Sequence, residues 1–500
     1  MNNSAEKPFP LANLDLNNII NLSDSYKDTQ PSMRPKGTTG VYSYYESRKG
    51  AKYPFTVLSG IQYLCIEFLC GQVVTQEKLD FATALNTEHF MSDDVFDASI
   101  WQNVIDNHGG KLPIRIRALP EGTRVPVGCV MFDIENLGET AFDRAKLKDI
   151  VNHLETLLMW AWHTSVMATK SVTIVERIKQ LAEICCDDPD MVALFLYHDM
   201  GMRGATGFEA AAKGGCSALI ATMGTDTKVA IPFAMKYYGA DMKTTAKSIP
   251  AAEHSVMTAR GREGESTVVG EILSKYTSGP IAMPGDSYDI ENFIRNIMGV
   301  DHYDTIMNRE GTFIIRPDSP RFEGDTPEDQ VLWIVESLGK IFGYTINSKK
   351  YKVLNPKVST IYADGLKDFN IDDIYDMLMA HGWSIENSAV GQGGGLHQDH
   401  SRDTQRVAIK SSAQERDRQW HDVFKDPLDK SKRSKAGKLK VIMLRGVLTT
   451  VRQDDKTYYD YEDLLKTIFE YGELVNPITF DEVRANAGVI DVDFVKSVFG

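Results

Sequence analysis

Two stretches of the chain, LFLYHDMGMRG at residues 194–204 and SALIATMGTDT at residues 217–227, indicate its fold. Each begins with a short apolar run and ends in polar, acidic or glycine-rich residues. The same pattern returns in GPIAMPGDSYD (279–289), TFIIRPDS (312–319), STIYADG (359–365) and SAVGQGGG (388–395). Short apolar runs bounded by turn residues are typical of buried strands.

The segments between these runs have a different periodicity. Residues 331–341 and 371–380, for example, carry apolar side chains at helical spacing. Strands that alternate with helices predict a parallel sheet, and the length of this region favours an irregular, TIM-like α/β barrel. Because barrel active sites form at the carboxyl ends of the strands, we expect ligand-binding groups at the polar ends of the runs.

The flanking sequence predicts a second domain. Residues 112–132 contain β-rich runs separated by the turn sequence PEGT, and VIMLRGVLTTVRQ (441–453) predicts a hairpin around Arg445 and Gly446. We expect both ends of the chain to build one mixed α+β sheet domain. The predicted parts are a polar arm at 1–20, a discontinuous sheet domain at 21–155 with 407–500, and a barrel domain at 156–406.

The composition narrows the class of protein. A formal charge of -14 disfavours general binding to nucleic acid or to anionic membrane, although a local basic pocket can still hold a small polyanion. The six cysteines include no CxxC pair and no Cys/His zinc spacing, which fits a reduced, cytoplasmic setting. The N-terminus lacks a secretory pattern, and the most apolar stretch, residues 157–168, is too short to span a bilayer.

The stretch GQGGGLHQDHSRD (391–403) is a candidate phosphate site. Consecutive glycines such as Gly393 and Gly394 let backbone N–H groups approach an anion closely. A plain glycine-rich turn is the commoner explanation of three glycines alone. Their place at the end of an apolar run, in a series of such runs, favours the phosphate cradle.

Four carboxylates, Asp226, Asp286, Asp318 and Asp364, each follow a separate apolar run. A single Asp after a strand is usually a turn or helix-capping residue. Four of them at one barrel mouth would repel one another unless they faced hydroxyls, cations or Mg²⁺. A phosphorylated sugar with bound Mg²⁺ supplies such partners.

Two arginines and one histidine complete the set of candidates. Arg203 and Arg316 occupy the same kind of position, and Arg offers planar donors to carbonyl or phosphate oxygens or a structural ion pair with a neighbouring carboxylate. His254 lies in SIPAAEHSVMTARG, where a surface or capping role is the commoner one. The residues alone therefore leave the role of His254 open.

Long motifs in a fixed order resemble the nicotinamide phosphoribosyltransferase family, from residue 21 almost to the C-terminus. They include NLSDSYK (21–27), VYSYYESR (41–48), KGGCSALIATMGTDT (213–227), SIPAAEHS (248–255), IIRPDS (314–319), GGGLHQDHSRD (393–403) and VFKDPLDKSKRSK (423–435). The resemblance implies a type II phosphoribosyltransferase that joins nicotinamide to phosphoribosyl pyrophosphate and gives nicotinamide mononucleotide. It also implies a homodimer with active sites at the subunit interface, Mg²⁺, and assistance by ATP hydrolysis.

The same resemblance implies a binding site for the pyridine base. Asp24 and Tyr26 would reach in from the partner subunit, with the ring between Tyr26 and Met200. Arg203 would contact the carboxamide oxygen, and Asp226 would accept a hydrogen bond from the amide NH₂. An ionised carboxylate repels the carboxylate of nicotinate, so Asp226 favours nicotinamide.

The resemblance further implies roles in catalysis and phosphate binding. Arg316 and Asp318 would border the ring and ribose, and His254 resembles the histidine that ATP phosphorylates. Ribose and Mg²⁺ would be held by Asp286 and Asp364, and the 5′-phosphate by Gly393 and Gly394. Pyrophosphate or ATP would be bound by Arg48, Arg402, Lys410 and Lys425.

Some positions depart from the family pattern. Met200 stands where the family usually has Phe, and Ala282 and Ala408 stand where hydroxyls are expected. Two alternatives therefore stay open. One is an enzyme of the same fold that uses nicotinate or another pyridine, against which Asp226 argues; the other is a non-catalytic ligand-binding protein, against which the retained His254 argues.

Overall fold

The computed structural model describes residues 15–428 and 433–500. Most of the predicted polar arm at 1–20 lies outside the described residues, as does part of the basic loop after Lys425. The chain forms two compact units. Unit 1 comprises residues 1–121, 125–162 and 405–477, and unit 2 comprises 122–124, 163–404 and 478–500.

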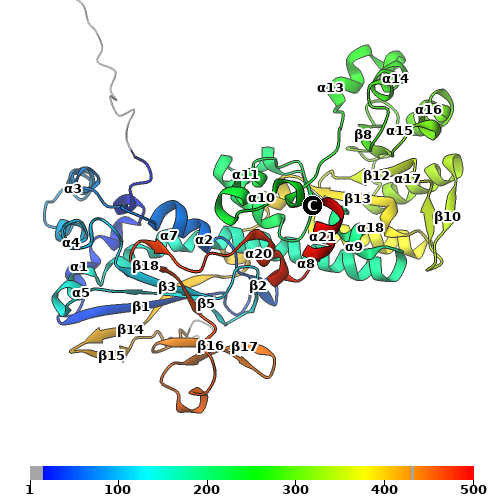
Figure 1. Ribbon diagram of the computed structural model, residues 1–500. Helices are drawn as coiled ribbons and strands as arrows, with labels where there is room; N and C mark the ends of the chain where they lie inside the picture. The colour runs from blue at the N-terminus through cyan, green and yellow to red at the C-terminus, as the bar shows by residue number, and fades with distance from the viewer. Residues whose placement is uncertain (1–14, 429–432) are drawn as a thin grey trace, which may run out of the picture. The chain divides into compact units, whose positions relative to one another are not determined.

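Both ends of the chain contribute to the main sheet of unit 1, which is antiparallel (Figure 1). Its strand order is β15-β14-β1-β5-β3-β18-β19. The strands are β1 (Thr38–Glu46), β3 (Ile114–Ala118), β5 (Val130–Asn136), β14 (Ala408–Arg416), β15 (Gln419–Asp422), β18 (Lys466–Glu470) and β19 (Glu473–Leu474). In its core the buried ring of Tyr45 stacks on Phe132 with a centroid distance of 4.4 Å.

Smaller elements surround this sheet. The predicted hairpin is confirmed as β16 (Leu439–Leu444) and β17 (Val447–Arg452), and its turn residues Arg445 and Gly446 have φ of 52° and 79°. Strands β2 (Phe55–Val57) and β4 (Arg124–Pro126) form a second pair. The helices are α1 (Gln30–Met33), α2 (Ile61–Leu64), α3 (Gln76–Phe90), α4 (Ala98–His108), α5 (Ala141–Leu147), α6 (Ile150–His153) and α7 (Glu155–Met159).

Unit 2 contains a six-stranded parallel sheet, and each of the six quoted runs contributes one strand. The order is β7-β6-β13-β12-β9-β8. The strands are β6 (Tyr197–Asp199), β7 (Gly224–Thr225), β8 (Ile281–Pro284), β9 (Phe313–Arg316), β12 (Val358–Tyr362) and β13 (Ser388–Gln392). The prediction of parallel strands is therefore confirmed, in the form of a curled half-barrel sheet.

An irregular segment, residues 247–252, hydrogen-bonds to both edges of this sheet. Lys247 N–H donates to the carbonyl of Met223, next to β7, over 2.8 Å. At the other edge Ala252 N–H donates to the carbonyl of Ala282 in β8, also over 2.8 Å. The open side of the half-barrel is thus bridged at each edge by an isolated pair of hydrogen bonds, without a regular strand.

Helices alternate with the strands, and the two predicted helical segments lie in α17 and α18. The helices are α8 (Ala161–Cys185), α9 (Pro189–Phe195), α10 (Phe208–Ala218), α11 (Ala230–Tyr238), α12 (Met242–Thr245), α13 (His254–Met257), α14 (Glu265–Lys275), α15 (Ile290–Asn292), α16 (Tyr303–Asn308), α17 (Pro327–Phe342), α18 (Asp368–Ala380) and α19 (Gly394–Gln398). A short hairpin, β10 (Tyr344–Ile346) and β11 (Lys352–Leu354), follows α17.

The last two helices, α20 (Phe480–Ala487) and α21 (Val492–Phe499), belong to unit 2. The predicted boundary had placed them in the sheet domain at 407–500, so that part of the prediction is corrected. Ile490 and Val495 pack with Leu194 and Met223 in one buried cluster. Burial of this apolar surface against α9 and the strand region holds the C-terminus in unit 2.

Candidate active site

A cavity of about 740 Å³ in unit 2 is lined by eight of the residues singled out in the sequence. They are Met200, Arg203, Asp226, Arg316, Asp318, Asp364, Gly393 and Gly394. They come from the carboxyl ends of different strands, which a parallel sheet places along one edge. The cavity is large enough for a small phosphorylated substrate.

A second cavity of about 540 Å³ shares Met200, Asp226 and Arg316 with the first. Its other walls are largely apolar, and include Phe195, Ile249, Ala282, Ile314, Ile361, Ala389 and Phe499. These three shared residues therefore separate a polar cavity from an apolar one. A flat aromatic ring with one polar substituent suits such a boundary.

Asp226 is held by the backbone and by a serine. Its N–H donates to the carbonyl of Asp199 over 2.8 Å, and Ser248 Oγ donates to Asp226 Oδ1 over 2.8 Å. These two contacts fix the position of the Asp226 carboxylate. Asp226 is therefore arranged as a hydrogen-bond acceptor at the wall common to both cavities.

His254 lies among carboxylates. Its Nε2 is 3.2 Å from Asp318 Oδ2 and 3.7 Å from Asp286 Oδ1, and its Nδ1 is 3.2 Å from Ser287 Oγ. Arg316 Nη1 donates to Asp318 Oδ1 over 2.9 Å. The backbone N–H of Asp318 donates to Asp286 Oδ2 over 2.9 Å, so the ends of β8 and β9 are joined.

The carboxylates repel one another. Burial, followed by the negative charges of Asp318 and Asp286, raises the pKa of Asp364 above its usual value. Asp286 Oδ1 is buried and has no hydrogen-bond partner among the described residues. A cation between Asp286 and Asp364 would relieve both effects, although no group of three or more described side chains forms a complete metal site.

The remaining predicted residues are divided between the units. In unit 1 the 3-10 helix η2 (Ser25–Lys27) carries Tyr26, which is 58% exposed. Asp24, which precedes η2, accepts a hydrogen bond from Thr156 Oγ1 over 2.7 Å. Arg402 lies in unit 2, where its exposed side chain is 3.5 Å from Asp403.

Unit 1 also contains a cluster of positive charge. Burial lowers the pKa of Lys410, and the nearby cations Arg48, Lys27 and Lys425 lower it further, against the opposing effect of Glu155. Arg48 Nε donates to the carbonyl of Arg406 over 3.1 Å, which fixes the arginine side chain. Such a cluster is suited to an anion of several charges.

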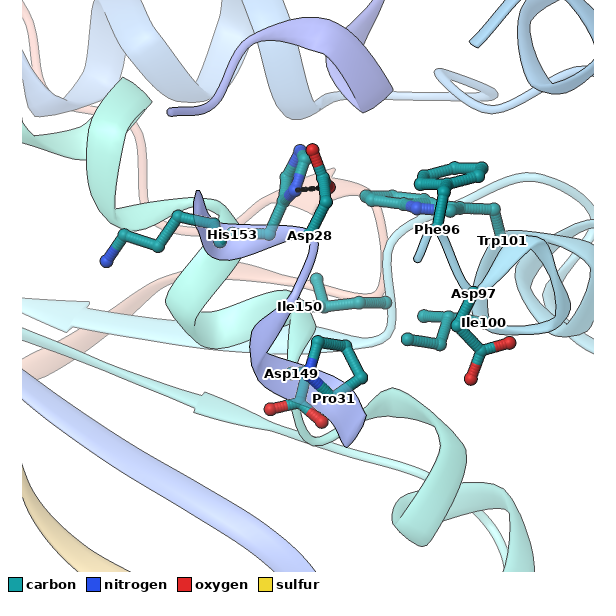
Figure 2. A pocket seen from close by; sticks show the side chains of 10 residues that line it. Asp28, Pro31, Phe96, Asp97, Ile100, Trp101, Asp149, Ile150 and His153 are labelled. Atoms are coloured by element: carbon teal, nitrogen blue, oxygen red, sulfur yellow. Dashed lines mark ion pairs between the residues drawn. The ribbon is translucent and has the colours of Figure 1, made fainter. Parts of the chain in front are cut away.

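Figure 2 shows a third cavity, which lies in unit 1 and is lined by Asp28, Trp101, His153 and their neighbours. His153 Nδ1 faces Asp28 Oδ1 at 3.7 Å across it. Its volume is only about 20 Å³, which is enough for a single water molecule. We therefore do not assign a substrate to it.

Four side chains that the sequence did not single out support this site. Ser248 holds Asp226 and Ser287 contacts His254. Asp199 and His397, both fully buried, are paired behind the glycines. All four lie inside the quoted motifs, but the residues that they contact are distant in sequence. Their position in a motif is therefore the only feature of the sequence that could have indicated them.

Comparison with known proteins agrees with the motifs. The model of the nicotinate phosphoribosyltransferase (NAPRTase) family matches residues 195–473, and that of the nicotinamide phosphoribosyltransferase N-terminal domain matches residues 18–116. A Xanthomonas campestris protein named nicotinamide phosphoribosyltransferase is 36% identical, over 94% of this chain and 98% of its own. An Acinetobacter baylyi protein of the same name is 28% identical, over 93% and 96%.

Solved structures support the fold. The nicotinate-nucleotide pyrophosphorylase of Pyrococcus furiosus has a TM-score of 0.56 at 16% identity, covering 96% of this chain and 97% of its own. Human nicotinic acid phosphoribosyltransferase has a TM-score of 0.56 at 14% identity, covering 94% and 93%. With the two family matches and a relative 36% identical over nearly its whole length, the chain belongs to the nicotinamide phosphoribosyltransferase family.

Proposed function

We propose that this protein transfers the phosphoribosyl group of phosphoribosyl pyrophosphate to nicotinamide, giving nicotinamide mononucleotide and pyrophosphate in NAD salvage. The observation that carries the proposal is the 740 Å³ cavity. It brings Arg203 and Asp226, which suit a carboxamide, together with Asp318 and the glycines, which suit a ribose phosphate. The names of the bacterial relatives support the same substrate.

The chain's own groups suit the charge changes of this reaction. As pyrophosphate leaves the anomeric carbon, positive charge develops on the ribose. Asp318 and Asp364, which both line the cavity, would stabilise this charge. Mg²⁺ held by Asp286 and Asp364 would neutralise charge on the pyrophosphate. The pyridine nitrogen needs positioning and no activating base, a task for Arg203, Asp226 and Met200.

We further propose that the basic cluster of Arg48, Lys410 and Lys425 in unit 1 binds pyrophosphate or ATP. Arg402, which belongs to unit 2, is proposed as a further ligand of pyrophosphate or ATP. His254 is the proposed site of phosphorylation by ATP, which would couple ATP hydrolysis to synthesis. Support comes from its imidazole nitrogens, which face Asp318 and Ser287 and are therefore oriented by hydrogen bonds. The side chain is 40% exposed, so a phosphoryl donor can reach it.

We also propose an irregular TIM-like barrel and a cytoplasmic homodimer with shared active sites. The hydrogen bonds of residues 247–252 to both edge strands support the barrel. Exposed apolar side chains near Asp24 and Tyr26, such as Leu16 (80% exposed) and Met33 (74%), support an interface there. Among the described residues, no helix has the length and apolar character needed to cross a membrane.

The test of the substrate is a comparison of two bases. The protein is incubated with phosphoribosyl pyrophosphate, Mg²⁺ and either nicotinamide or nicotinate, and the nucleotide formed is identified. We expect nicotinamide mononucleotide as the main product. Nicotinate mononucleotide as the main product would favour the nicotinate alternative, and no nucleotide from either base would refute both.

Asp226→Asn tests the origin of the preference. Loss of the negative charge should reduce the ratio of kcat/KM for nicotinamide over nicotinate by roughly tenfold or more. Asp376→Asn is the matched control, because Asp376 is exposed in the same unit and its ion-pair partner is Arg177, outside the cavity. An unchanged ratio in Asp226→Asn would contradict the role of this carboxylate.

A further inference from the structure

Two loops of the active site meet directly in unit 2. The base loop, residues 200–204, carries Met200 and Arg203, and the glycine cradle is Gly393, Gly394 and Gly395. A Cβ atom added to Gly204 would lie 2.5 Å from Gly394 Cα, and one added to Gly201 would lie 2.6 Å from the carbonyl oxygen of Gly393. The backbones of the two loops are therefore packed against each other, with no room for side chains between them.

A buried pair lies behind this contact. Asp199 ends β6, His397 lies on α19, and both side chains are fully buried. His397 Nε2 is 3.1 Å from Asp199 Oδ1 and 3.3 Å from Oδ2. His397 Nδ1 is buried with no hydrogen-bond partner among the described residues, so the donating proton belongs on Nε2.

The pair connects the two loops through the backbone. Asp199 Oδ1 also accepts a hydrogen bond from Gly201 N–H in the base loop, over 2.9 Å. His397 follows the glycine cradle on the same short helix. On the solvent side Gln398 Nε2 donates to the carbonyl of Gly204 over 2.7 Å, which joins the loops a second time.

We propose that Asp199 and His397 are positioning residues that hold the base loop and the glycine cradle as one rigid body. The inference rests on the proposed function and deepens it. The base would be bound by one loop and the 5′-phosphate by the other, so a fixed separation of the loops fixes the ring relative to the anomeric carbon. Transfer between two bound reactants depends strongly on such alignment.

Three variants separate this role from a general contribution to folding. His397→Leu removes the donor to Asp199 at similar volume. His397→Gln keeps an amide N–H at nearly the same distance along the side chain. His381→Leu is the control, because His381 is an exposed histidine of the same unit at the end of α18.

Hydrogen–deuterium exchange of the unliganded proteins tests the coupling itself. In His397→Leu we expect peptides covering both 200–204 and 391–399 to exchange faster, while His397→Gln and His381→Leu stay near the wild type. Unchanged exchange in His397→Leu, or faster exchange in only one loop, overturns the proposal. If His397→Leu does not fold, Asp199→Ala replaces it with the same expected outcome, because alanine removes the oxygen that accepts from both His397 and Gly201.

Ligand binding tests the consequence. Nicotinamide mononucleotide and nicotinamide riboside differ by the 5′-phosphate, so the ratio of their affinities reports the cradle alone. We expect His397→Leu to weaken the mononucleotide roughly tenfold more than the riboside, with rescue by His397→Gln. Equal losses for both ligands overturn the proposal. Wild-type protein that binds neither would refute the proposed function, and the exchange result would still decide whether the pair couples the loops.

Discussion

Met200 lines both cavities at the position where the family resemblance predicts phenylalanine. Its sulfur packs on the backbone of Gly391, where an added Cβ would lie 2.6 Å from Sδ. A thioether contacts an aromatic ring favourably but orients it less than a stacked ring does. We therefore expect Met200→Phe to lower the KM for nicotinamide about threefold in steady-state kinetics. An unchanged or higher KM would show that the thioether is not the weak part of the base site.

His254 allows a test of ATP coupling. If it is the phosphorylated group, ATP should increase the rate of nicotinamide mononucleotide synthesis by the wild type and leave that of His254→Ala unchanged. Ser287→Ala is a milder variant for comparison, because it removes only the hydroxyl 3.2 Å from His254 Nδ1 and keeps the histidine. Phosphate incorporated from labelled ATP, measured beside the rate, should be absent in His254→Ala. An undiminished gain from ATP in that variant would contradict the coupling.

The titration of the buried His163 should make the stability of the protein depend on pH. Burial, followed by the positive charge of Lys213, lowers its pKa to about 3. An unfolded histidine titrates near pH 6.5, so the unfolded state takes up the proton first as the pH falls. The contribution of neutral His163 to the free energy of unfolding is therefore fully present above about pH 6.5. The free energy of unfolding decreases by roughly 2 kcal/mol when the pH falls to about 4.5.

Urea unfolding at several pH values measures this loss. His163→Gln should flatten the decrease, because glutamine cannot take up the proton. The exposed His381→Gln should leave the slope as it is. A wild-type slope in His163→Gln would mean that other groups produce the acid sensitivity.

At the scale of elements, one arginine of α20 adds to the apolar cluster that holds the C-terminus in unit 2. The fully buried Arg484 donates to the carbonyls of Leu219, Thr244 and Thr245 over 2.9, 2.8 and 2.6 Å. Burial lowers its pKa to about 10, so it is still charged at neutral pH. Removal of this cation would leave three buried carbonyls without their donors.

Arg484→Met should therefore lower the free energy of unfolding by about 3 kcal/mol in urea titrations. Arg484→Lys keeps the charge with fewer donors and should lose less. A loss below about 1 kcal/mol in Arg484→Met would show that apolar packing of α20 and α21 is sufficient.

Periodicity explains which elements could be predicted. The strands of the parallel sheet lie in six apolar runs, and α17 and α18 lie on segments of helical spacing, because both patterns are local. The place of α20 and α21 was predicted wrongly. An amphipathic helix shows that one face is buried, but not which surface covers it.

At the scale of the whole molecule, the proposed homodimer with shared active sites makes a prediction about mixtures of two variants. Tyr26→Ala and Asp318→Ala should each be nearly inactive alone. In a mixed dimer one site would carry both substitutions and the other neither. In an evenly mixed, co-expressed sample about half of the dimers are mixed, and each has one intact site of two. Activity should therefore return to about a quarter of the wild type, and two affinity tags show that mixed dimers have formed. Mixtures as inactive as their parents would contradict shared sites, and co-expressed copies of one variant are the control.

The sequence by itself determined the parallel strands, the polar residues that end them and the resemblance to a family, since each is carried by neighbouring residues or by long ordered motifs. Only the tertiary structure decided which of these residues meet. Ser248 with Asp226, and Asp199 with His397, are pairs made by strand order and loop packing. No local pattern encodes such contacts, because they depend on the path of the chain between distant segments. The candidate residues of the site could therefore be named from the motifs, and the contacts between them only from the fold.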